Sequence, residues 1–322
     1  TNYEYRQFVE SILRDSLSVL GETKIMSDYY PDTTRWAEDL KMPGYQTRDF
    51  TYGDPMTENY FSSPAFDMYP VVGVNWSAAK YFCDWRSKLM NSYRKTQGLS
   101  ALPRFTLPTE SEWEWAARGG RASAKYPWGN PYLSNAKGCL LANFKPHRGN
   151  YDADGYEYTA PANAYSPNDY GLYNMAGNVN EWVADAYRPM TSYDEEDLNS
   201  YRGNVFMQKQ LDPDGIPVEK DSLGRIVYEP VPDEDLVNRR NYKKSDVINY
   251  LDGDEISEVT YDYAKTTLIS DKARVFKGGS WADMPFWLSP GTRRFFDQDL
   301  SAATICFRCA MERVGSPAGN DT

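Results

Sequence analysis

Apolar residues near the start of the chain recur with the spacing of a helix. Six of them fall on one face when the chain turns every 3.6 residues: Tyr5, Phe8, Val9, Ile12, Leu13 and Leu17. The pattern predicts an amphipathic helix over residues 3–18, with this face packed on a core.

A second helix is predicted after Ser77, whose hydroxyl is suited to accept a hydrogen bond from a free N–H of the first turn. The residues that continue the helical spacing are Ala79, Phe82, Cys83, Arg86 and Leu89. Because Cys83 lies within this series, we expect it to be a small buried residue rather than a nucleophile.

A third helix has a clearer start. Thr109 is followed three residues later by Glu112, the spacing of a capping box, in which each side chain accepts from the other residue's backbone N–H. Gly119 and Gly120 then supply the left-handed conformation that ends a helix.

The intervening segments show no such period. Residues 31–70 are rich in Pro, Gly, Asp and Tyr, which predicts a long ordered coil, whereas residues 69–76 read as a short buried strand. Residues 191–272 contain 19 Asp and Glu against 10 Lys and Arg, and few aliphatic residues. We therefore expect a single domain over residues 1–322 with an acidic surface insert at about 191–272.

The charge of the chain limits its partners. A formal net charge of -11, with no basic stripe, argues against nucleic acid, because phosphate binding needs clustered Lys and Arg. No apolar run reaches the roughly 18–20 residues of a membrane span. Four cysteines leave the redox compartment open.

The sequence offers little for ordinary acid–base or nucleophilic catalysis. Its single histidine, His147, lies in a polar turn, which argues against a Ser-His-Asp or Cys-His site. Glu110, Glu112 and Glu114 alternate along a helix and are not expected to converge, so capping and solvation explain them better. Cys306 and Cys309 form a CxxC, but a structural zinc would need two further thiols or imidazoles.

Six sequence blocks then occur in a characteristic order: YPVVGVNWSAAKYFCDW, RFTLPTESEWEWAARGG, YPWGN, SPNDYGLYNMAGNVNEW, RVFKGGSW and CFRCA. This series resembles the formylglycine-generating-enzyme (sulfatase-modifying-factor) family. The resemblance implies an α+β fold that is irregular, loop-rich and distantly related to C-type lectins. It also implies that the chain begins inside the family's N-terminal segment.

Active members of that family oxidise a sulfatase cysteine with a copper ion held by two cysteines after the KGGS block. Counted from Gly278, Gly279 and Ser280, the two ligand positions fall on Asp283 and Leu288. A carboxylate and an isobutyl group are unsuited to a soft copper ion. The resemblance thus implies a pseudoenzyme that holds no copper.

Calcium is the metal that the resemblance does imply. The first site would take Asn143, the Phe144 carbonyl, Asp154 and the Tyr156 carbonyl, within a segment whose Asn150, Asp152 and Asp154 imitate part of a calcium loop. The second site would take oxygen atoms of Asn174, Gly177, Val179 and Glu181. The alternative is that both segments are Asx turns with solvated acids.

The resemblance also concerns a disulfide. Cys309 stands where the family often has a half-cystine, whose usual partner position is occupied here by Ala116 or Ala117. A disulfide between Cys306 and Cys309, or another pairing, therefore stays open.

Within the family, residues 30–36, 52–57 and 141–151 are similar to the gliding-motility and type IX secretion lipoproteins of the GldK/PorK group, with a GldJ-like paralogue as the weaker match. This similarity implies a non-catalytic subunit of a periplasmic ring, lipid-anchored to the outer membrane and assembled with a GldN/PorN-type partner. Peptidoglycan and outer-membrane proteins are further candidate partners. The alternatives are a peptidoglycan- or glycan-binding module and a residual sulfatase-modifying oxidase.

Overall fold

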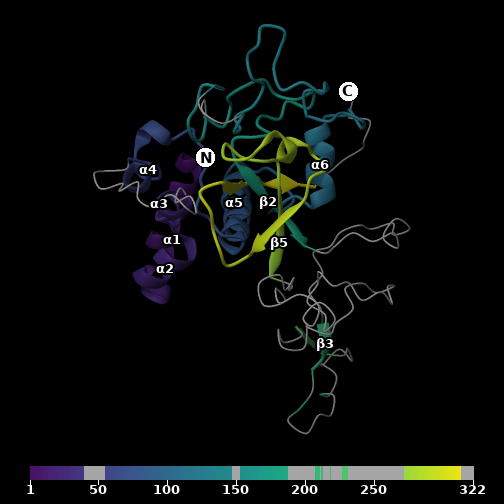
Figure 1. Ribbon diagram of the computed structural model, residues 1–322. Helices are drawn as coiled ribbons and strands as arrows, with labels where there is room; N and C mark the ends of the chain where they lie inside the picture. Colours follow the sequence, from purple (N-terminus) through teal and green to yellow (C-terminus); the bar gives the residue numbers. More distant parts are fainter. Residues whose placement is uncertain are drawn as a thin grey trace, which may run out of the picture. The chain divides into compact units, whose positions relative to one another are not determined.

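The computed structural model describes residues 1–39, 55–146, 153–187, 207–210, 212, 218, 227–230 and 272–312. Within them the fold is a mixed and irregular α/β arrangement, in which long connections separate short regular elements (Figure 1). Two compact units divide the chain, one formed by Thr1–Ala184 with Val275–Thr322 and the other by Asp185–Arg274. Most of the predicted acidic insert lies outside the described residues, so that its role as an insert stays a prediction.

Helices come mainly from the first third of the chain. They are α1 (Asn2–Leu20), α2 (Glu22–Tyr29), α3 (Arg35–Asp39), α4 (Pro55–Asn59), α5 (Trp76–Thr96) and α6 (Glu110–Arg118), with the 3-10 turns η1 (Pro64–Phe66) and η4 (Pro285–Leu288). The predicted helix over residues 3–18 is confirmed by α1, which buries Tyr5, Phe8 and Val9. Short helices interrupt the predicted coil at 31–70, so that part of the prediction was wrong; residues 40–54 lie outside the described residues.

Strands are short. They are β1 (Phe105–Thr106), β2 (Asn180–Ala186), β3 (Met207–Lys209), β4 (Tyr228–Pro230), β5 (Ala273–Lys277), β6 (Arg294–Asp297), β7 (Ile305–Phe307) and β8 (Ala310–Met311). One sheet has the order β6-β5-β2-β7, with β2 and β7 parallel and Asn180 opposite Ile305. β1 pairs antiparallel with β8, and β3 with β4.

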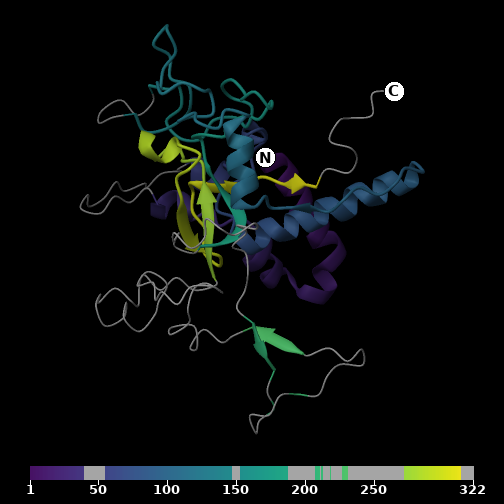
Figure 2. The same ribbon diagram turned by 90° about the vertical axis from the view of Figure 1, so that its right-hand side faces the viewer.

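The helix starts follow local chemistry. Thr109 and Glu112 form the predicted capping box, and Gly119 ends α6 with a φ of 55°. The cap of α5 was predicted wrongly: Asn75, not Ser77, accepts from the Ala78 N–H at 2.8 Å. Asn75 is the N-cap because the helix begins at Trp76, so Ser77 already lies inside its first turn. Figure 2 shows α5 as a long helix whose C-terminal end runs away from the other helices.

The strand predicted at 69–76 does not form. Its valines are buried, but the chain turns at Gly73, whose φ is 74°, and the Gly73 carbonyl accepts from the Asp32 N–H at 2.8 Å. A Cβ at this position would lie 2.5 Å from the Asp32 carbonyl oxygen, so only glycine allows the close approach. The run of apolar residues therefore indicates a buried segment, but not a hydrogen-bonded β-strand.

The main core of the first unit is built from aromatic rings. Tyr5 stacks on Phe82 with ring centroids 5.6 Å apart, and Phe307 meets the same Phe82 edge-on at 5.3 Å. These contacts join α1, α5 and β7, which are far apart in sequence. A smaller apolar cluster lies beside η4 and consists of Tyr126, Ala142, Phe144, Ala176 and Leu288.

Candidate functional site

The loop that follows β5 carries the two positions at which the resemblance places copper ligands. β5 is buried along its whole length, and Gly278 and Gly279 then turn the chain with φ of 103° and 73°. A Cβ on Gly278 would lie 3.1 Å from the Trp113 ring, and one on Gly279 would lie 3.0 Å from the Trp287 carbonyl oxygen. The KGGS block is thus a tight turn against α6 and η4 that fixes the position of Asp283.

Asp283 is held from three sides by hydrogen-bond donors. Its Oδ2 accepts from the Ser280 N–H at 2.8 Å, the Ser280 hydroxyl at 2.7 Å and the Asn180 amide at 3.1 Å. The Arg294 guanidinium donates to Oδ1 at 2.6 Å and to Oδ2 at 2.7 Å. Burial opposes ionisation, but Arg294 and the hydrogen bonds outweigh it and hold the pKa of Asp283 below its ordinary value.

Arg294 is itself fixed in place. Its guanidinium carbon lies 4.4 Å from the centroid of the Trp287 ring and 4.9 Å from that of Phe276, and it donates to Asn180 Oδ1 at 2.5 Å. Asp283 and Arg294 therefore form a closed, two-pronged ion pair that joins the loop to β6 and β2. The donors to the carboxylate belong to Ser280, Asn180 and Arg294, and the guanidinium neutralises its charge within the fold.

Leu288 has become part of the apolar interior. Its side chain is fully buried in the smaller cluster, together with Phe144 and Tyr126. An isobutyl group offers no donor atom to a metal. The donor chemistry of Asp283 and Leu288 therefore does not fit a soft copper ion.

A second charged group lies beneath the same loop. The side chain of Lys277 is fully buried, and its Nζ lies 3.2 Å from Glu110 Oε1 and 3.4 Å from Glu114 Oε2. Arg293 adds a bond to Glu110 at 2.6 Å, and together these cations hold the pKa of Glu110 low against the opposing effect of burial. The prediction that these glutamates are merely capping or solvated groups was wrong for Glu110 and Glu114. They stand one turn apart and converge on Lys277, whereas Glu112 does cap α6.

The first predicted calcium site contains an unused acceptor. Asn143 is buried, its amide donates to the Tyr158 carbonyl at 2.6 Å, and its Oδ1 has no hydrogen-bond partner among the residues that the structure describes. Asp154 reaches the same backbone, since its two oxygens accept from the N–H groups of Phe144 at 2.8 Å and Tyr156 at 3.1 Å. An orphaned amide oxygen beside a carboxylate fits a hard cation. Asn150 and Asp152 lie outside the described residues.

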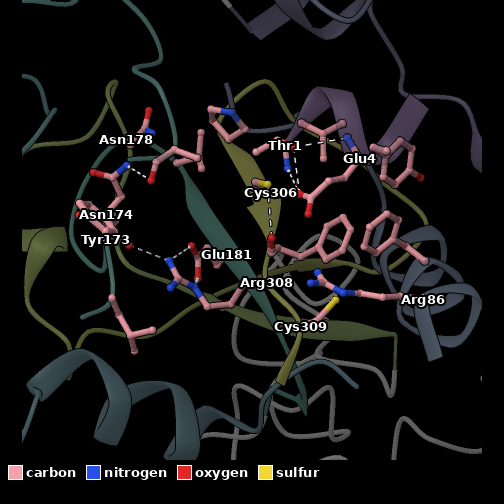
Figure 3. A pocket seen from close by; sticks show the side chains of 18 of the residues that line it. Thr1, Glu4, Arg86, Tyr173, Asn174, Asn178, Glu181, Cys306, Arg308 and Cys309 are labelled. Atoms are coloured by element: carbon pink, nitrogen blue, oxygen red, sulfur yellow. Dashed lines mark hydrogen bonds and ion pairs between the residues drawn. The ribbon is translucent and has the colours of Figure 1, made fainter. Parts of the chain in front are cut away.

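The second predicted calcium site is occupied by protein groups. Figure 3 shows Arg308 lying against Glu181. The guanidinium donates to the two carboxylate oxygens at 2.5 Å and 2.6 Å, and Trp113 Nε1 donates at 2.7 Å. The Asn174 amide is used by the carbonyls of Pro161 and Ala162. Because Arg308 already neutralises Glu181, this set fits a cation less well than the first.

The two sets are connected through Gly177. Its φ is 77°, and a Cβ there would lie 2.3 Å from the Asn143 carbonyl oxygen, which accepts from the Asn178 N–H at 2.8 Å. Val179 is buried next to them. No group of three or more His, Cys, Asp or Glu suited to a metal occurs among the described residues, so any cation site here depends on amide and carbonyl oxygens.

A cavity of about 400 Å³ opens beside Glu181 and Arg308. Its wall includes both cysteines of the CxxC (Figure 3). Cys306 is buried and its Sγ donates to the Phe307 carbonyl at 3.5 Å, while Cys309 is half-buried and lies 3.2 Å, Sγ to Sγ, from Cys83 of α5. All four cysteines are thiols in the structure. Cys83 is buried, as predicted.

His147 lies outside the described residues. No helix among those that are described is both long enough and apolar enough to cross a membrane. The ion pairs of Asp283, Lys277 and Glu181 were missed by the sequence reasoning. Their only signal was the presence of Arg and Lys in the RVFKGGS, TRRFF and CFRCA segments.

Comparison with known proteins assigns a family. Residues 1–221 match the model of the sulfatase-modifying factor enzyme 1-like domain. The inactive C-alpha-formylglycine-generating enzyme 2 of Bos taurus is 32% identical over 213 residues, which cover 63% of this chain and 62% of that protein. The formylglycine-generating enzyme of Thermomonospora curvata is 43% identical over 120 residues, or 36% of this chain and 33% of that protein. The chain thus spans less than two thirds of the curated relatives it matches.

Among solved structures, PvdO from Pseudomonas aeruginosa aligns with a TM-score of 0.43 and 20% identity, covering 76% of this chain and 63% of that one.

Proposed function

We propose, from the premise that the chain belongs to the sulfatase-modifying factor enzyme 1-like domain family, that it is a non-catalytic member acting as a structural subunit of the type IX secretion system. The observation that carries the non-catalytic part is the loop after β5. In the family register, Asp283 and Leu288 stand at the copper-ligand positions, where Asp283 is bound by Arg294 and Leu288 is core. The similarity to inactive relatives points the same way.

The assembly role is supported by the GldK/PorK-like segments. Each of them contributes a buried side chain: Trp36 stacks on Trp281 with ring centroids 6.1 Å apart, Met56 lies in the main core, and Phe144 is in the same cluster as Leu288. Segments that characterise a subgroup are thus built into the scaffold. The proposed place is the periplasm, in a ring beneath the outer membrane, anchored by an N-terminal lipid outside this sequence and assembled with a GldN/PorN-type partner.

Calcium would have a structural part in this subunit. Asn143, Asp154 and the carbonyls of Phe144 and Tyr156 would hold one ion, and its charge would add to the hydrogen bonds that join these two loops. A second ion at Asn174, Gly177, Val179 and Glu181 would have to share Glu181 with Arg308.

Co-expression tests the assembly role. The chain, in its full-length form with a GldN/PorN-type partner from the same operon, is expected to copurify in large rings visible by electron microscopy. A monodisperse chain that fails to bind this partner, while its thermal unfolding stays cooperative, would contradict the proposal. Phe286→Ser and Trp115→Ser, at side chains 67% and 66% exposed, then locate the contact.

The rival enzymatic function makes an opposite prediction. A residual sulfatase-modifying oxidase would convert the cysteine of a CxPxR peptide to an aldehyde when copper is supplied, whereas the Asp283–Arg294 pair predicts no conversion. An active family member assayed in parallel shows that the peptide and the copper are competent. Aldehyde formed by this chain would overturn the non-catalytic assignment.

A glycan-binding function has one observation in its favour. Trp115 and Tyr170 form an exposed aromatic pair with ring centroids 4.8 Å apart, and such rings can stack on sugar faces. The distant relation to C-type lectins that the resemblance implies would support a glycan-binding function. Sedimentation with peptidoglycan sacculi tests it, since Trp115→Ser should release the chain if this pair is the platform.

A further inference from the structure

The C-terminal end of α5 and the turn after it, residues 85–104, are called the α5 tip below. Figure 2 shows this end of the helix running away from the other helices. Three apolar side chains of the tip are largely open to solvent: Leu89 is 52% exposed, Tyr93 61% and Leu99 52%. We propose that the α5 tip is a docking surface for an anionic lipid bilayer.

The charge of the α5 tip is opposite to that of the chain as a whole. Five basic residues and no Asp or Glu occur in it, whereas the whole chain has a net charge of -11; the five are Arg86, Lys88, Arg94, Lys95 and Arg104. Asp84, the acid just before the tip, accepts from Arg104 at 2.8 Å and so offsets that one cation. Anionic headgroups attract such a cluster, and each cation near the surface strengthens binding about fivefold.

The helix arranges its basic and apolar side chains along separate lines. α5 turns about 100° per residue, so Lys88 and Lys95, which are seven positions apart, share one edge of the helix. Leu89 and Tyr93 are four positions apart and form the apolar line next to that edge. A helix with a basic edge beside an apolar stripe is typical of segments that lie in the membrane interface.

An apolar groove continues the same surface towards α1. It has a volume of about 450 Å³, and its apolar wall consists of Phe82, Trp85, Leu89, Met90 and Tyr93. Glu4 of α1 and Arg86 of α5 also line it, so that the acid and the base of this wall stand together. The groove adds apolar area that acyl chains can cover, beyond the three exposed side chains of the tip.

The turn after α5 has a fixed shape that holds Leu99 outward. The chain reverses at Gly98, whose φ is 68°, and the Leu99 N–H donates to the Arg94 carbonyl at 2.9 Å. The Arg94 guanidinium in turn donates to the Ser100 carbonyl at 2.7 Å. A bilayer therefore meets a preformed surface, and binding needs little further ordering of the chain.

A bilayer suits the α5 tip better than an acidic protein segment does. The cations and the exposed apolar side chains stand together at a projecting end, which a flat surface can approach directly. A bilayer offers anionic headgroups and acyl chains at the same place, and so matches both kinds of side chain. The inference does not depend on the proposed assembly role, because none of these residues enters the argument for that role.

Cosedimentation of the full chain with vesicles tests the proposal. The chain is expected to pellet with vesicles of equimolar phosphatidylcholine and phosphatidylglycerol, far less with phosphatidylcholine alone, and to be released at high salt. Combined Lys88→Gln and Lys95→Gln should weaken binding about 30-fold. The matched control, Lys24→Gln with Lys137→Gln, changes the net charge equally at exposed positions elsewhere and should bind like the wild type.

Leu99 separates insertion from simple charge attraction. Leu99→Ser should weaken binding several-fold, whereas Leu99→Trp should strengthen it, because Trp favours the membrane interface. Tyr132→Ser is the control, since Tyr132 is 71% exposed and lies outside the tip. All these positions are exposed, so the melting temperature of each variant should stay close to that of the wild type.

Three results would overturn the proposal. The first is no sedimentation with anionic vesicles at low salt. The second is vesicle binding that the tip variants leave unchanged. The third is binding to soluble polyglutamate that requires Lys88 and Lys95 while the Leu99 variants bind vesicles like the wild type, which would favour an acidic protein segment. Ring assembly is measured without lipid, so failure of either experiment leaves the other result standing.

Discussion

The loop after β5 and the loops around Asn143 differ in how completely they satisfy their own polar groups. In the first, Asp283 accepts five hydrogen bonds from Ser280, Asn180 and Arg294, and Leu288 fills the neighbouring core. In the second, Asn143 Oδ1 is buried and has no hydrogen-bond partner within the described part of the chain, while Asp154 accepts from the N–H of the next residue, Phe144. In the first region the carboxylate is therefore fully engaged by protein donors, and in the second a buried acceptor is left unpaired among the described residues.

This difference bears differently on copper and calcium, the two metals that bind members of the family that the chain resembles. In the register that the resemblance implies, Asp283 and Leu288 stand at the two thiolate positions for copper; Asp283 is bound by Arg294, and Leu288 lies in the smaller apolar cluster. The site that the resemblance implies for a hard cation would offer it an amide oxygen, a carboxylate and two carbonyls. The predictions below test each half of the contrast.

The largest effect is expected at the closed loop, from Leu288→Ala. Leu288 is fully buried in the cluster that contains Tyr126 and Phe144, so removal of its side chain should leave a cavity and lower the free energy of unfolding by about 2–5 kcal/mol. Urea unfolding measures it. Leu300→Ala is the control, because Leu300 is 49% exposed and should lose much less. Equal losses for the two variants would show that Leu288 is not part of a packed core.

Breaking the ion pair of the same loop should cost nearly as much. Asp283→Asn leaves the Arg294 charge beside Trp287 and Phe276 without its partner, and the expected loss is roughly 2–4 kcal/mol after allowance for the partial exposure of the pair. Urea unfolding of Asp283→Asn is compared with that of Asp169→Asn, which breaks the exposed pair with Arg121 and should change little. A similar loss in both variants would contradict the closed-loop interpretation. Recovery in Asp283→Leu combined with Arg294→Met would strengthen it.

How far the sequence predicted this arrangement depends on the distance along the chain over which each feature is encoded. The capping box of Thr109 and Glu112 was predictable because its two residues are three positions apart. Lys277 and Glu110 are 167 positions apart, and Arg308 and Glu181 are 127 apart, so no local pattern announces either pair. These ion pairs arise only when the fold brings β5 next to α6 and the end of β7 next to β2.

The error at residues 69–76 has the same origin. A run of valines is equally compatible with a buried strand and with a buried irregular segment. Gly73 decides between the two structures, because the chain turns there and its carbonyl bonds to Asp32, some forty residues earlier. Glycine in an apolar run was the available signal, because it permits a close approach that a ladder does not need.

Calcium provides the test of the open region. Added calcium should raise the melting temperature of the wild type, by an amount equivalent to about 1–3 kcal/mol at concentrations well above the dissociation constant. Asp154→Asn should abolish most of this increment, whereas Asp169→Asn, with the same change of charge, should keep it. Differential scanning calorimetry with and without a chelator gives the increment separately from the baseline loss. A wild type that does not respond to calcium would favour the Asx-turn interpretation of Asn143 and Asp154.

The smallest expected effect is the dependence of stability on pH, and it belongs to the closed loop and the Lys277 cluster beneath it. Asp283 and Glu110 have pKa values lowered in the fold from ordinary values of 3.8 and 4.5, since Arg294, Arg293 and Lys277 favour their charged forms over the cost of burial. A lowered pKa means that the unfolded chain binds protons more readily than the folded one. The stability these groups contribute is therefore fully present above about pH 4.5 and is lost as the pH falls through their folded pKa values. Urea unfolding between pH 7 and pH 3 should show this decline, and Asp283→Asn should make it shallower. Glu157→Gln, at an exposed side chain, should leave the slope unchanged. An Asp283→Asn variant with the wild-type slope would show that the carboxylate is not ionised against Arg294, and the closed loop would then owe its stability to Leu288 and its neighbours alone.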